Sequence, residues 1–460
     1  MHVPSVIFRE YDIRGVVDRE LTPDVAHGIG RAVATRTARA MDRAPRLVVG
    51  RDNRPSGERL ARAVRDGIAL TGATAIDIGT VPTPALYLAL HELDVDGGIQ
   101  VTGSHNPPEF NGFKMVALGE TLHGPAIQEL RAMIERDDTV QGNGSLAVND
   151  SMLDRYVDAI TQRNGPLARP IKVVVDCGNG VTSLVAERTL RGIGAEVVPL
   201  FCESDGTFPN HHPDPTVLKN LRDLQERVRG VDAELGIAFD GDGDRIGAVD
   251  ENGTVVYGDQ LLVLLGRHLA EHAGPGHPVI FDVKCSMVLE EGLRRVGLRP
   301  EMWKTGHSLI KARMKELHAP LAGEMSGHMF FGGDYYGFDD ALFAAARLLT
   351  FLGGRPGPLS VLLADLPQTY TTPELRVDCS EAEKFTIVAR AAEHFGRKYA
   401  TVTIDGVRIV FANGWGLLRA SNTQPALVLR FEATSEADLA RYRGEVEDWL
   451  RAQGVSPGGA

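Results

Sequence analysis

The chain has 460 residues, of which 43% are hydrophobic and 24% charged, a composition typical of a large soluble globular protein with about three or four domains. No apolar run approaches the roughly 18 residues that a membrane-spanning helix needs. The N-terminus also lacks the basic start and apolar core of a signal peptide, so we expect a cytoplasmic protein that does not bind membranes. The net charge of -12 disfavours nucleic acid as a partner, because binding to its phosphate backbone depends on clustered Lys and Arg.

The cysteines give no sign of a structural role. Cys177, Cys202, Cys285 and Cys379 are scattered without paired spacing, so the sequence indicates neither a disulfide framework nor a zinc site. No feature of the sequence points to an obligate protein partner.

The first structural signals are a loop and a helix. The polar segment 8–15 contains two arginines and a tyrosine, and on its own it is typical of a surface loop. Thr22 then caps a predicted helix that has Pro23 at its first position and runs to about Met41.

A strand, a polar turn, a helix and a second strand then occur in the same order three times. The first strands are 47–50, 172–176 and 278–282, the helices are 60–71, 183–191 and 288–296, and the second strands are 75–78, 196–198 and 301–303. Three such units predict three similar α/β domains with mixed or largely parallel sheets. Ligands of such sheets bind beyond the carboxyl ends of the strands, where these polar turns lie.

The turn 102–107, Thr-Gly-Ser-His-Asn-Pro, follows a short strand at 98–100. Ser104 could be a nucleophile or carry a phosphate there, or the turn could use its Ser, Asn and Pro for backbone geometry alone. The residue types leave both interpretations open. A serine hydrolase is disfavoured, because Asn106 breaks the Gly-x-Ser-x-Gly pattern and such enzymes need no metal.

The strongest chemical signal is an acidic run between two apolar strands, 235–239 and 246–249. It places Asp240, Asp242 and Asp244 at alternate positions with glycines between them. Three neighbouring carboxylates repel one another unless a cation lies among them, and oxygen ligands favour Mg²⁺ over zinc. The sequence therefore predicts a catalytic metal site.

A calcium loop of the EF-hand type is the alternative, because Glu251 falls at its twelfth position. However, Arg245 occupies the sixth position, where that loop needs Gly, and the run follows a predicted strand instead of a helix.

Three more short loops carry polar side chains suited to a sugar phosphate. His307 follows the last strand of the third unit and could act as an acid or base. Glu324 and Ser326, at alternate positions, could bind adjacent sugar hydroxyls. The turn 419–425 combines Arg419 with two hydroxyls and an amide, a set suited to a phosphate group. The chain before and around this turn predicts a linker and a smaller α+β domain. Two prolines in the segment 366–373 predict the linker. The domain is predicted from helices at 382–395 and 436–451 and from strands at 402–411, 416–419 and 427–431.

Together and in this order, these segments resemble the α-D-phosphohexomutases along essentially the whole chain, most closely the bacterial phosphomannomutase/phosphoglucomutase branch. The matching segments are 11–15, 102–107, 240–245, 282–285, 304–311, 323–328 and 419–425. The resemblance implies three similar α/β domains and a smaller α+β domain around a central cleft. We place them at 1–150, 151–253, 254–366 and 367–460.

The resemblance also implies the roles of the site residues. Ser104 matches the phosphoserine, and Asp240, Asp242 and Asp244 would hold Mg²⁺ together with a phosphate oxygen on Ser104. The other expected catalytic residues are Lys114, Arg245, His307 and Arg14. The expected substrate-binding residues are Tyr11, Lys284, Lys304, Glu324, Ser326, His328, Arg419, Ser421, Asn422 and Thr423.

The implied reaction interconverts hexose 1-phosphate and hexose 6-phosphate through a phosphoserine enzyme and a hexose 1,6-bisphosphate, which also serves as activator. Met325 stands where phosphoglucosamine mutases typically carry Gln, which favours mannose and glucose phosphates as substrates. Two alternatives stay open: a phosphoglucosamine mutase, and a metal-dependent sugar-phosphate phosphatase that uses the same serine.

Overall fold

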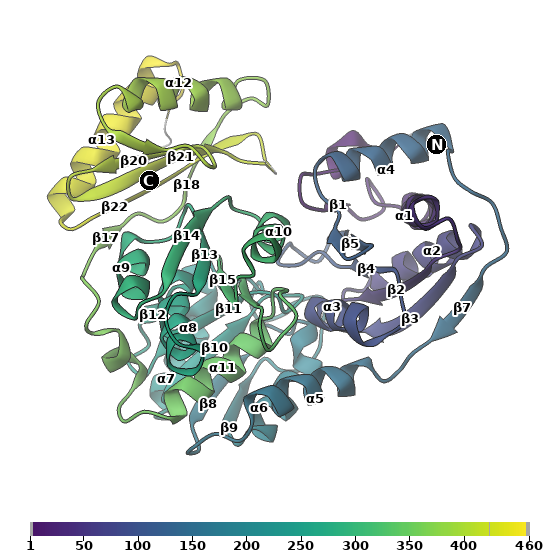
Figure 1. The fold of residues 1–460 in the computed structure, drawn as a ribbon, viewed down its shortest axis with the longest axis horizontal. Coiled ribbons are helices and arrows are strands. Elements are labelled where there is room, and N and C mark those ends of the chain that lie inside the picture. Colours follow the sequence, from purple (N-terminus) through teal and green to yellow (C-terminus); the bar gives the residue numbers. More distant parts are fainter. Residues whose placement is uncertain (1–2, 423, 457–460) are drawn as a thin grey trace.

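The first third of the chain forms a mixed sheet of strand order β1-β5-β4-β2-β3-β7, with β6 beside β5 (Figure 1). The computed structural model describes residues 3–422 and 424–456. The strands are β1 (Ile13–Val16), β2 (Arg46–Arg51), β3 (Thr74–Thr80), β4 (Gly97–Val101), β5 (Phe110–Ala117), β6 (Glu120–Thr121) and β7 (Ser145–Val148), and the helices are α1 (Pro23–Met41), α2 (Gly57–Ala69), α3 (Thr83–Glu92) and α4 (Pro125–Arg136). β2 is parallel to β3 and β4, whereas β5 is antiparallel to β4 and β1.

Two local predictions for this part have different outcomes. The helix cap is confirmed, because the Thr22 side chain accepts a hydrogen bond from the backbone N–H of Val25. The loop interpretation of 8–15 is wrong at its end, where β1 begins. Ile13 is fully buried and pairs with Phe113 of β5. Burial of this apolar side chain stabilises the segment as a strand of the sheet.

The next two parts of the chain form a sheet of order β12-β11-β10-β8-β9 and a sheet of order β14-β13-β15-β16. The first contains β8 (Lys172–Asp176), β9 (Glu196–Leu200), β10 (Leu235–Phe239), β11 (Ile246–Asp250), β12 (Val255–Val256), α5 (Met152–Asn164), α6 (Ala186–Gly192) and α7 (Arg222–Gly230). The second contains β13 (Pro278–Asp282), β14 (Arg299–Trp303), β15 (Leu321–Gly323), β16 (Met329–Phe331), α8 (Gly258–Ala273), α9 (Met287–Arg295), α10 (His307–Leu317) and α11 (Ala341–Gly353). The predicted helix at 183–191 is instead a 3₁₀ turn (Val181–Leu184) followed by α6, because Thr182 and Ser183 favour turns over helix interiors.

One hydrophobic core joins these two parts and reaches the first. It includes Leu86 of α3, Ile160 of α5, Val263 of α8 and Leu349 of α11. The predicted domain boundaries at 150, 253 and 366 therefore stay predictions, since packing continues across them. Among the described residues, no helix is both long and apolar enough to cross a membrane.

The last part is an antiparallel sheet of order β17-β22-β21-β20-β19, with β18 also on β22. Its elements are β17 (Tyr370–Thr371), β18 (Leu375–Asp378), β19 (Ala400–Val402), β20 (Val407–Phe411), β21 (Gly414–Ala420), β22 (Ala426–Ala433), α12 (Lys384–Gly396) and α13 (Glu436–Ala452). Both helices pack on one face (Figure 1). The predicted linker at 366–373 contains β17, which pairs with β22, and the predicted strand at 402–411 is two strands joined by a turn at Gly406, whose φ is +82°.

The other face of this sheet rests on the third domain. Trp415 and Leu417 form a small apolar cluster with Val283. The buried Arg408 guanidinium donates hydrogen bonds to the carbonyl oxygens of Val283 at 2.6 Å and Cys285 at 2.8 Å. The fourth domain therefore fixes the backbone on both sides of the predicted substrate-binding Lys284.

Asp340 caps α11 in a fully buried position. Its carboxylate accepts hydrogen bonds from the backbone N–H of Phe343 at 2.8 Å, from Tyr156 at 2.7 Å and from Tyr335 at 2.8 Å. Burial outweighs these contacts and raises the pKa of Asp340 to about 7.

This pKa predicts a pH-dependent stability. The folded state holds the Asp340 proton up to about pH 7, whereas the unfolded chain loses it near pH 4. The free energy of unfolding from this group therefore falls as pH rises through that window. We expect Asp340→Asn, which keeps the capping oxygen, to raise the melting temperature relative to the parent more at pH 8 than at pH 5. An equal difference at both pH values would contradict this.

Candidate active site

The acidic triad lies in the turn from β10 to β11, and all three side chains are fully buried. Oxygens of Asp240, Asp242 and Asp244 lie within 4.8 Å of one another. Asp240 Oδ1 accepts hydrogen bonds from the backbone N–H groups of Gly243, Asp244 and Arg245 at 3.0–3.1 Å. Gly243 has a φ of +81°, a conformation that favours glycine. The turn thus folds around Asp240 Oδ1, and Asp240 Oδ2 points out of the turn.

Asp242 and Asp244 each use one carboxylate oxygen for hydrogen bonds within the protein. Asp242 Oδ2 accepts from Lys114 Nζ at 2.6 Å and from Thr83 Oγ1 at 2.5 Å, and Lys114 also bonds Asp244 Oδ2. Asp242 Oδ1 and Asp244 Oδ1 are buried without a hydrogen-bond partner. Buried carboxylate oxygens without a donor suit a hard divalent cation, so the residues fit the predicted metal.

The charges of the triad are strongly interdependent. Burial, together with the charges of Asp242 and Asp244, holds the pKa of Asp240 well above its usual range. Burial also opposes ionisation of Asp242, but Lys114 outweighs it, so the pKa of Asp242 lies below its usual range. Lys114 alone therefore does not balance three negative charges, and a further cation would allow Asp240 to ionise.

Ser104 faces this triad from the turn after β4. Its Oγ lies 3.2 Å from Asp240 Oδ2 and 3.1 Å from His105 Nδ1. The backbone of Ser104 has a φ of +51°, a conformation uncommon for a residue other than glycine and frequent at functional sites. A Cβ at position 241 would lie 2.4 Å from the Ser104 carbonyl oxygen, so only glycine lets the two loops approach this closely.

Arg54, which was not among the predicted site residues, holds the Ser104 loop in place. Its side chain is fully buried and donates hydrogen bonds to the carbonyl oxygens of Ser104, Asn106, Pro107 and Phe110 at 2.5–3.0 Å. Its ion-pair partner is Asp52, at 3.0 Å. These five contacts fix the loop that presents Ser104.

Asp52 completes the same arrangement from the other side of the loop. It accepts hydrogen bonds from Thr102 Oγ1 at 2.7 Å and from the backbone N–H of Gly103 at 3.2 Å. Thr102 Oγ1 in turn accepts from the backbone N–H of Ser104 at 2.8 Å. Arg54 and Asp52 therefore position Ser104 without touching its hydroxyl group.

We expect Arg54→Met to lower the free energy of unfolding by about 3–5 kcal/mol, because it leaves the Asp52 charge buried and unpaired. Chemical denaturation measures this change. Arg51→Met is the control, since Arg51 is the last residue of β2 and pairs with the exposed Glu58 at 2.9 Å and with Asp77 at 3.3 Å, and solvent-accessible pairs contribute about 0–1 kcal/mol each. An equal loss of unfolding free energy in the two variants would contradict this role of Arg54.

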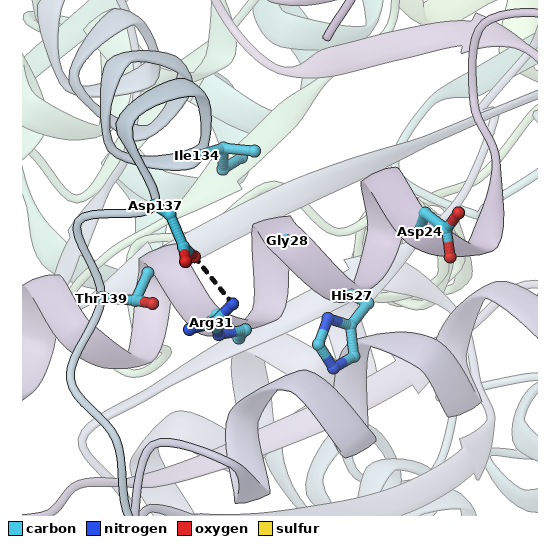
Figure 2. A pocket seen from close by; sticks show the side chains of 7 residues that line it. All are labelled: Asp24, His27, Gly28, Arg31, Ile134, Asp137 and Thr139. Atoms are coloured by element: carbon cyan, nitrogen blue, oxygen red, sulfur yellow. Dashed lines mark hydrogen bonds and ion pairs between the residues drawn. The ribbon is translucent and has the colours of Figure 1, made fainter. Parts of the chain in front are cut away.

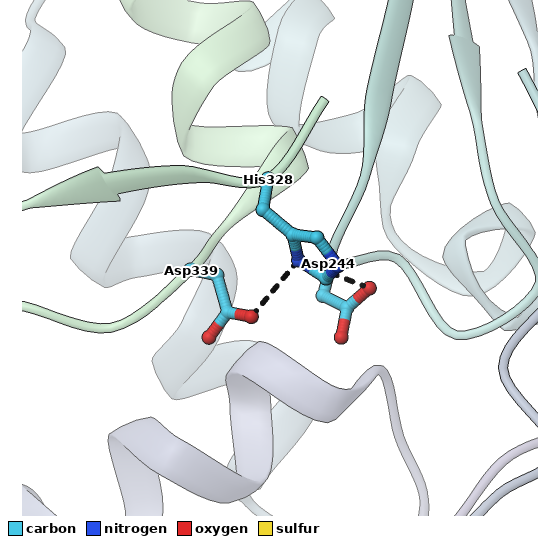
Figure 3. A group of neighbouring side chains, drawn as sticks. All are labelled: Asp244, His328 and Asp339. Atoms are coloured by element: carbon cyan, nitrogen blue, oxygen red, sulfur yellow. Dashed lines mark ion pairs between the residues drawn. The ribbon is translucent and has the colours of Figure 1, made fainter. Parts of the chain in front are cut away.

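A second network joins His328 to the buried carboxylates of Asp339 and Asp244 (Figure 3). Asp339 Oδ2 lies 3.0 Å from His328 Nδ1 and 3.9 Å from His307 Nδ1, and Asp339 Oδ1 accepts from Lys311 at 3.1 Å. His328 Nε2 accepts from Arg245 Nε at 2.9 Å. Arg245 and both histidines are thus held beside the triad.

Asp339 was not among the predicted site residues. The signal available in the sequence was Asp339-Asp340 directly before the apolar helix at 341–353, which is equally typical of an ordinary helix cap. Burial, followed by the charge of Lys311, holds the pKa of His307 well below its usual range. The neutral imidazole can therefore accept a proton near neutral pH.

Loops of three domains meet around Tyr11. Its hydroxyl donates to the carbonyl oxygen of Thr305 at 2.9 Å and accepts from Asn422 Nδ2 at 2.6 Å. Burial raises the pKa of Tyr11 to about 12, so the hydroxyl keeps its proton. Glu324 lies in the same region, because its Oε1 accepts from the backbone N–H of Gly306 at 2.7 Å.

The other predicted site residues have the following contacts and positions. Arg419 pairs with Asp405 at 3.0 Å, and Lys284 lies 3.6 Å from Glu374 and 3.7 Å from Asp282. Arg14 pairs with Asp12 at 2.6 Å, Ser421 accepts from the backbone N–H of Gln424 at 3.1 Å, and Ser326 is half-buried in the turn after β15. Lys304 is exposed, and Thr423 lies outside the described residues.

The calcium-loop alternative finds no support in the structure. The acidic run joins two antiparallel strands instead of two helices, so the calcium-loop interpretation is wrong. A pocket of about 220 Å³ lies on α1 and the loop after α4 (Figure 2), where Arg31 pairs with Asp137 at 3.0 Å. None of its lining residues belongs to the predicted site.

The whole chain matches one family. Residues 5–141, 154–253 and 257–370 match the models of phosphoglucomutase/phosphomannomutase alpha/beta/alpha domains I, II and III, and residues 374–448 match that of the C-terminal domain. The chain belongs to the phosphoglucomutase/phosphomannomutase family, the α-D-phosphohexomutases. The predicted four-domain architecture, three α/β domains and a smaller one, is therefore confirmed.

Similar proteins match this chain along nearly its full length. The chain is 46% identical to the phosphomannomutase/phosphoglucomutase of Pseudomonas aeruginosa over 452 residues, 98% of this chain and 96% of the relative. It is 44% identical to the phosphoglucomutase of Neisseria gonorrhoeae over 441 residues, 95% of each. A crystal structure of a family protein from Burkholderia thailandensis superimposes with a TM-score of 0.91 at 44% identity and covers 100% of this chain and 99% of that one.

The chain is thus an isomerase of carbohydrate metabolism that acts as a hexose-phosphate mutase. Phosphosugar substrates agree with this membership. The family is metal-dependent, and the triad is a candidate site for the metal.

Proposed function

We propose that Ser104 carries the phosphoryl group of this mutase and passes it to hexose phosphates. The observation that supports this most directly is the 3.2 Å contact between Ser104 Oγ and Asp240 Oδ2, beside Lys114 and Arg245. A phosphate on this oxygen would lie among cations that offset its charge.

The metal we propose is Mg²⁺, held by Asp240, Asp242 and Asp244 with a phosphate oxygen on Ser104. Supporting this are oxygen-only ligands and the two carboxylate oxygens without a partner. When bound, the ion neutralises charge on the transferring phosphoryl group. Lys114 already bonds Oδ2 of Asp242 and Oδ2 of Asp244, so it offsets part of their charge and leaves the Oδ1 atoms to bind the ion.

The two half-reactions have the same form. The phosphoryl group on Ser104 passes to the free hydroxyl of a hexose 1-phosphate, which gives a 1,6-bisphosphate. This intermediate reorients, its C1 phosphate returns to Ser104, and hexose 6-phosphate leaves; added hexose 1,6-bisphosphate serves as activator. His307, neutral by burial, accepts the hydroxyl proton, while Arg245 and Arg14 add positive charge.

The rest of the predicted set binds the sugar and its unreacting phosphate. Glu324 and Ser326 would bind two hydroxyls, with His328 beside them. Arg419, Ser421 and Asn422 would bind the phosphate that does not react, together with Thr423, and Lys284 and Tyr11 lie next to them. Of this set, Lys304 has the least support because it is exposed.

We expect Arg419→Ala to raise KM about 10-fold to 100-fold while kcat changes by less than about threefold, because Arg419 contacts only the unreacting phosphate. Steady-state kinetics with glucose 1-phosphate measure both constants. Lys398→Ala, which removes an exposed cation of the fourth domain that pairs with Glu445, is the control and should leave both constants unchanged. An unchanged KM in Arg419→Ala would remove the fourth domain from substrate binding.

The preferred sugars that we propose are mannose and glucose, on the evidence of Met325 and of the names of the relatives above. Turnover on mannose 1-phosphate, glucose 1-phosphate and glucosamine 1-phosphate tests this proposal. Dominance of the glucosamine substrate would overturn it. In the same assay, release of inorganic phosphate without isomer formation would identify a phosphatase instead of a mutase.

A further inference from the structure

Two thiols lie side by side where β8 and β9 end. Cys177 follows the last residue of β8, and Cys202 lies just beyond β9; these strands pair in parallel, with Asp176 opposite Leu200. The backbone N–H of Cys177 donates to the carbonyl oxygen of Leu200 at 3.2 Å. Both thiols are free, and their sulfurs are 3.3 Å apart. The spacing of the cysteines in the sequence does not indicate this pair, because the two thiols become neighbours only when β8 and β9 pair in the sheet.

The geometry of the pair is close to that of a disulfide. The 3.3 Å separation exceeds a disulfide bond of about 2.05 Å by about 1.2 Å. Cys177 is fully buried, whereas Cys202 is half-buried, so a small oxidant from solvent meets Cys202 first. The contact with Cys177 also lowers the pKa of Cys202 against the effect of burial, which favours the reactive thiolate.

We propose that Cys177 and Cys202 form a reversible disulfide when a peroxide reaches the protein, and that this bond slows turnover. In the first step Cys202 attacks hydrogen peroxide, the O–O bond breaks, and Cys202 sulfenic acid and one water form. In the second step the Cys177 sulfur attacks the Cys202 sulfur and a second water leaves. The two thiols thus supply the two electrons that reduce the peroxide, and an added dithiol restores both by exchange.

The turn that begins at Cys177 supports the metal loop. The backbone N–H of Val181 donates to the carbonyl oxygen of Gly241 at 3.1 Å, and a Cβ at Gly180 would meet that oxygen at 3.0 Å. On its other side, the carbonyl oxygen of Asn179 accepts from Asn53 Nδ2 of the first domain at 2.7 Å. Because the turn packs this closely against Gly241, drawing Cys177 toward Cys202 displaces its contacts with the loop of Asp240 and Asp242.

The effect on turnover rests on the proposed function, whereas formation of the bond does not. The full-length protein is treated with hydrogen peroxide, its thiols are blocked, and its peptides are mapped by mass spectrometry. We expect one cross-linked peptide pair that contains Cys177 and Cys202 and lacks two hydrogen atoms. We also expect kcat to fall about 10-fold, since shifts below 1 Å in a positioned site have effects of this order, and dithiothreitol to restore it.

Variants separate this bond from general oxidation. Cys202→Ser should keep the parent's basal kcat and resist peroxide, and Cys177→Ala serves as a second variant should Cys202→Ser lower the melting temperature. Cys379→Ser, which removes a thiol of the fourth domain, should lose activity like the parent. Absence of the cross-linked peptide overturns the proposal, as does a cross-linked protein with full turnover or equal inactivation of Cys202→Ser. Retained activity in Ser104→Ala would instead count against the proposed function and leave the peptide result standing.

Discussion

The Ser104→Ala variant is expected to lose about 10⁴-fold or more of its mutase turnover while it keeps the parent's fold. Removing a covalent nucleophile costs rates of this order. The fold should persist because the loop is held mainly by Arg54 and Asp52 through backbone groups that alanine also has. Coupled assay of glucose 6-phosphate formation measures the rate, and circular dichroism and melting temperature check the fold.

A mass measurement makes the same test independent of the assay. After incubation with glucose 1,6-bisphosphate, the parent should gain one phosphoryl group on the peptide that contains Ser104, and hexose monophosphate should remove it. Ser104→Ala should gain none. Asn106→Ala, in the same turn, is the control and should still be phosphorylated. Full turnover in Ser104→Ala, or a stable phosphoryl group elsewhere, would remove Ser104 from the carrier role.

The metal loop could be predicted because all of its chemistry lies within one turn. Asp240, Asp242 and Asp244 are close in sequence, and two apolar strands bound the turn, so the local pattern alone brings the carboxylates together. The three repeated units were predictable for the same reason: strand and helix periods and polar turns are local signals.

The supporting residues could not be predicted, because their roles exist only between distant segments. Asp339 matters through Lys311 and His328, which reach it from α10 and from the end of the turn after β15. Arg54 looks like any charged turn residue until the sheet brings the 104–110 loop over it. Lys304 stays a prediction, since a matching motif does not fix where a flexible side chain points, and this one is exposed.

The second large effect concerns the metal. We expect Asp242→Asn to weaken Mg²⁺ binding at least about 10-fold to 100-fold and to lower turnover about 10²-fold to 10³-fold. Asparagine keeps an oxygen for Thr83, yet it removes one of three charges that face the cation and loses the ion pair with Lys114. Calorimetric titration with Mg²⁺ measures binding, and activity after chelation and readdition of Mg²⁺ measures the requirement.

Thr83→Val is the matched control, because it removes a contact of Asp242 at 2.5 Å but leaves the carboxylate charge in place. Its Mg²⁺ affinity should fall by about 10-fold, the lower end of the loss for a residue that only supports a ligand, and by less than that of Asp242→Asn. Asp242 Oδ1 and Asp244 Oδ1, which accept no hydrogen bond, are the oxygens we expect to bind the ion. If Asp242→Asn binds Mg²⁺ as tightly as the parent, the charge of Asp242 does not contribute to the metal site, which would contradict the proposed set of ligands.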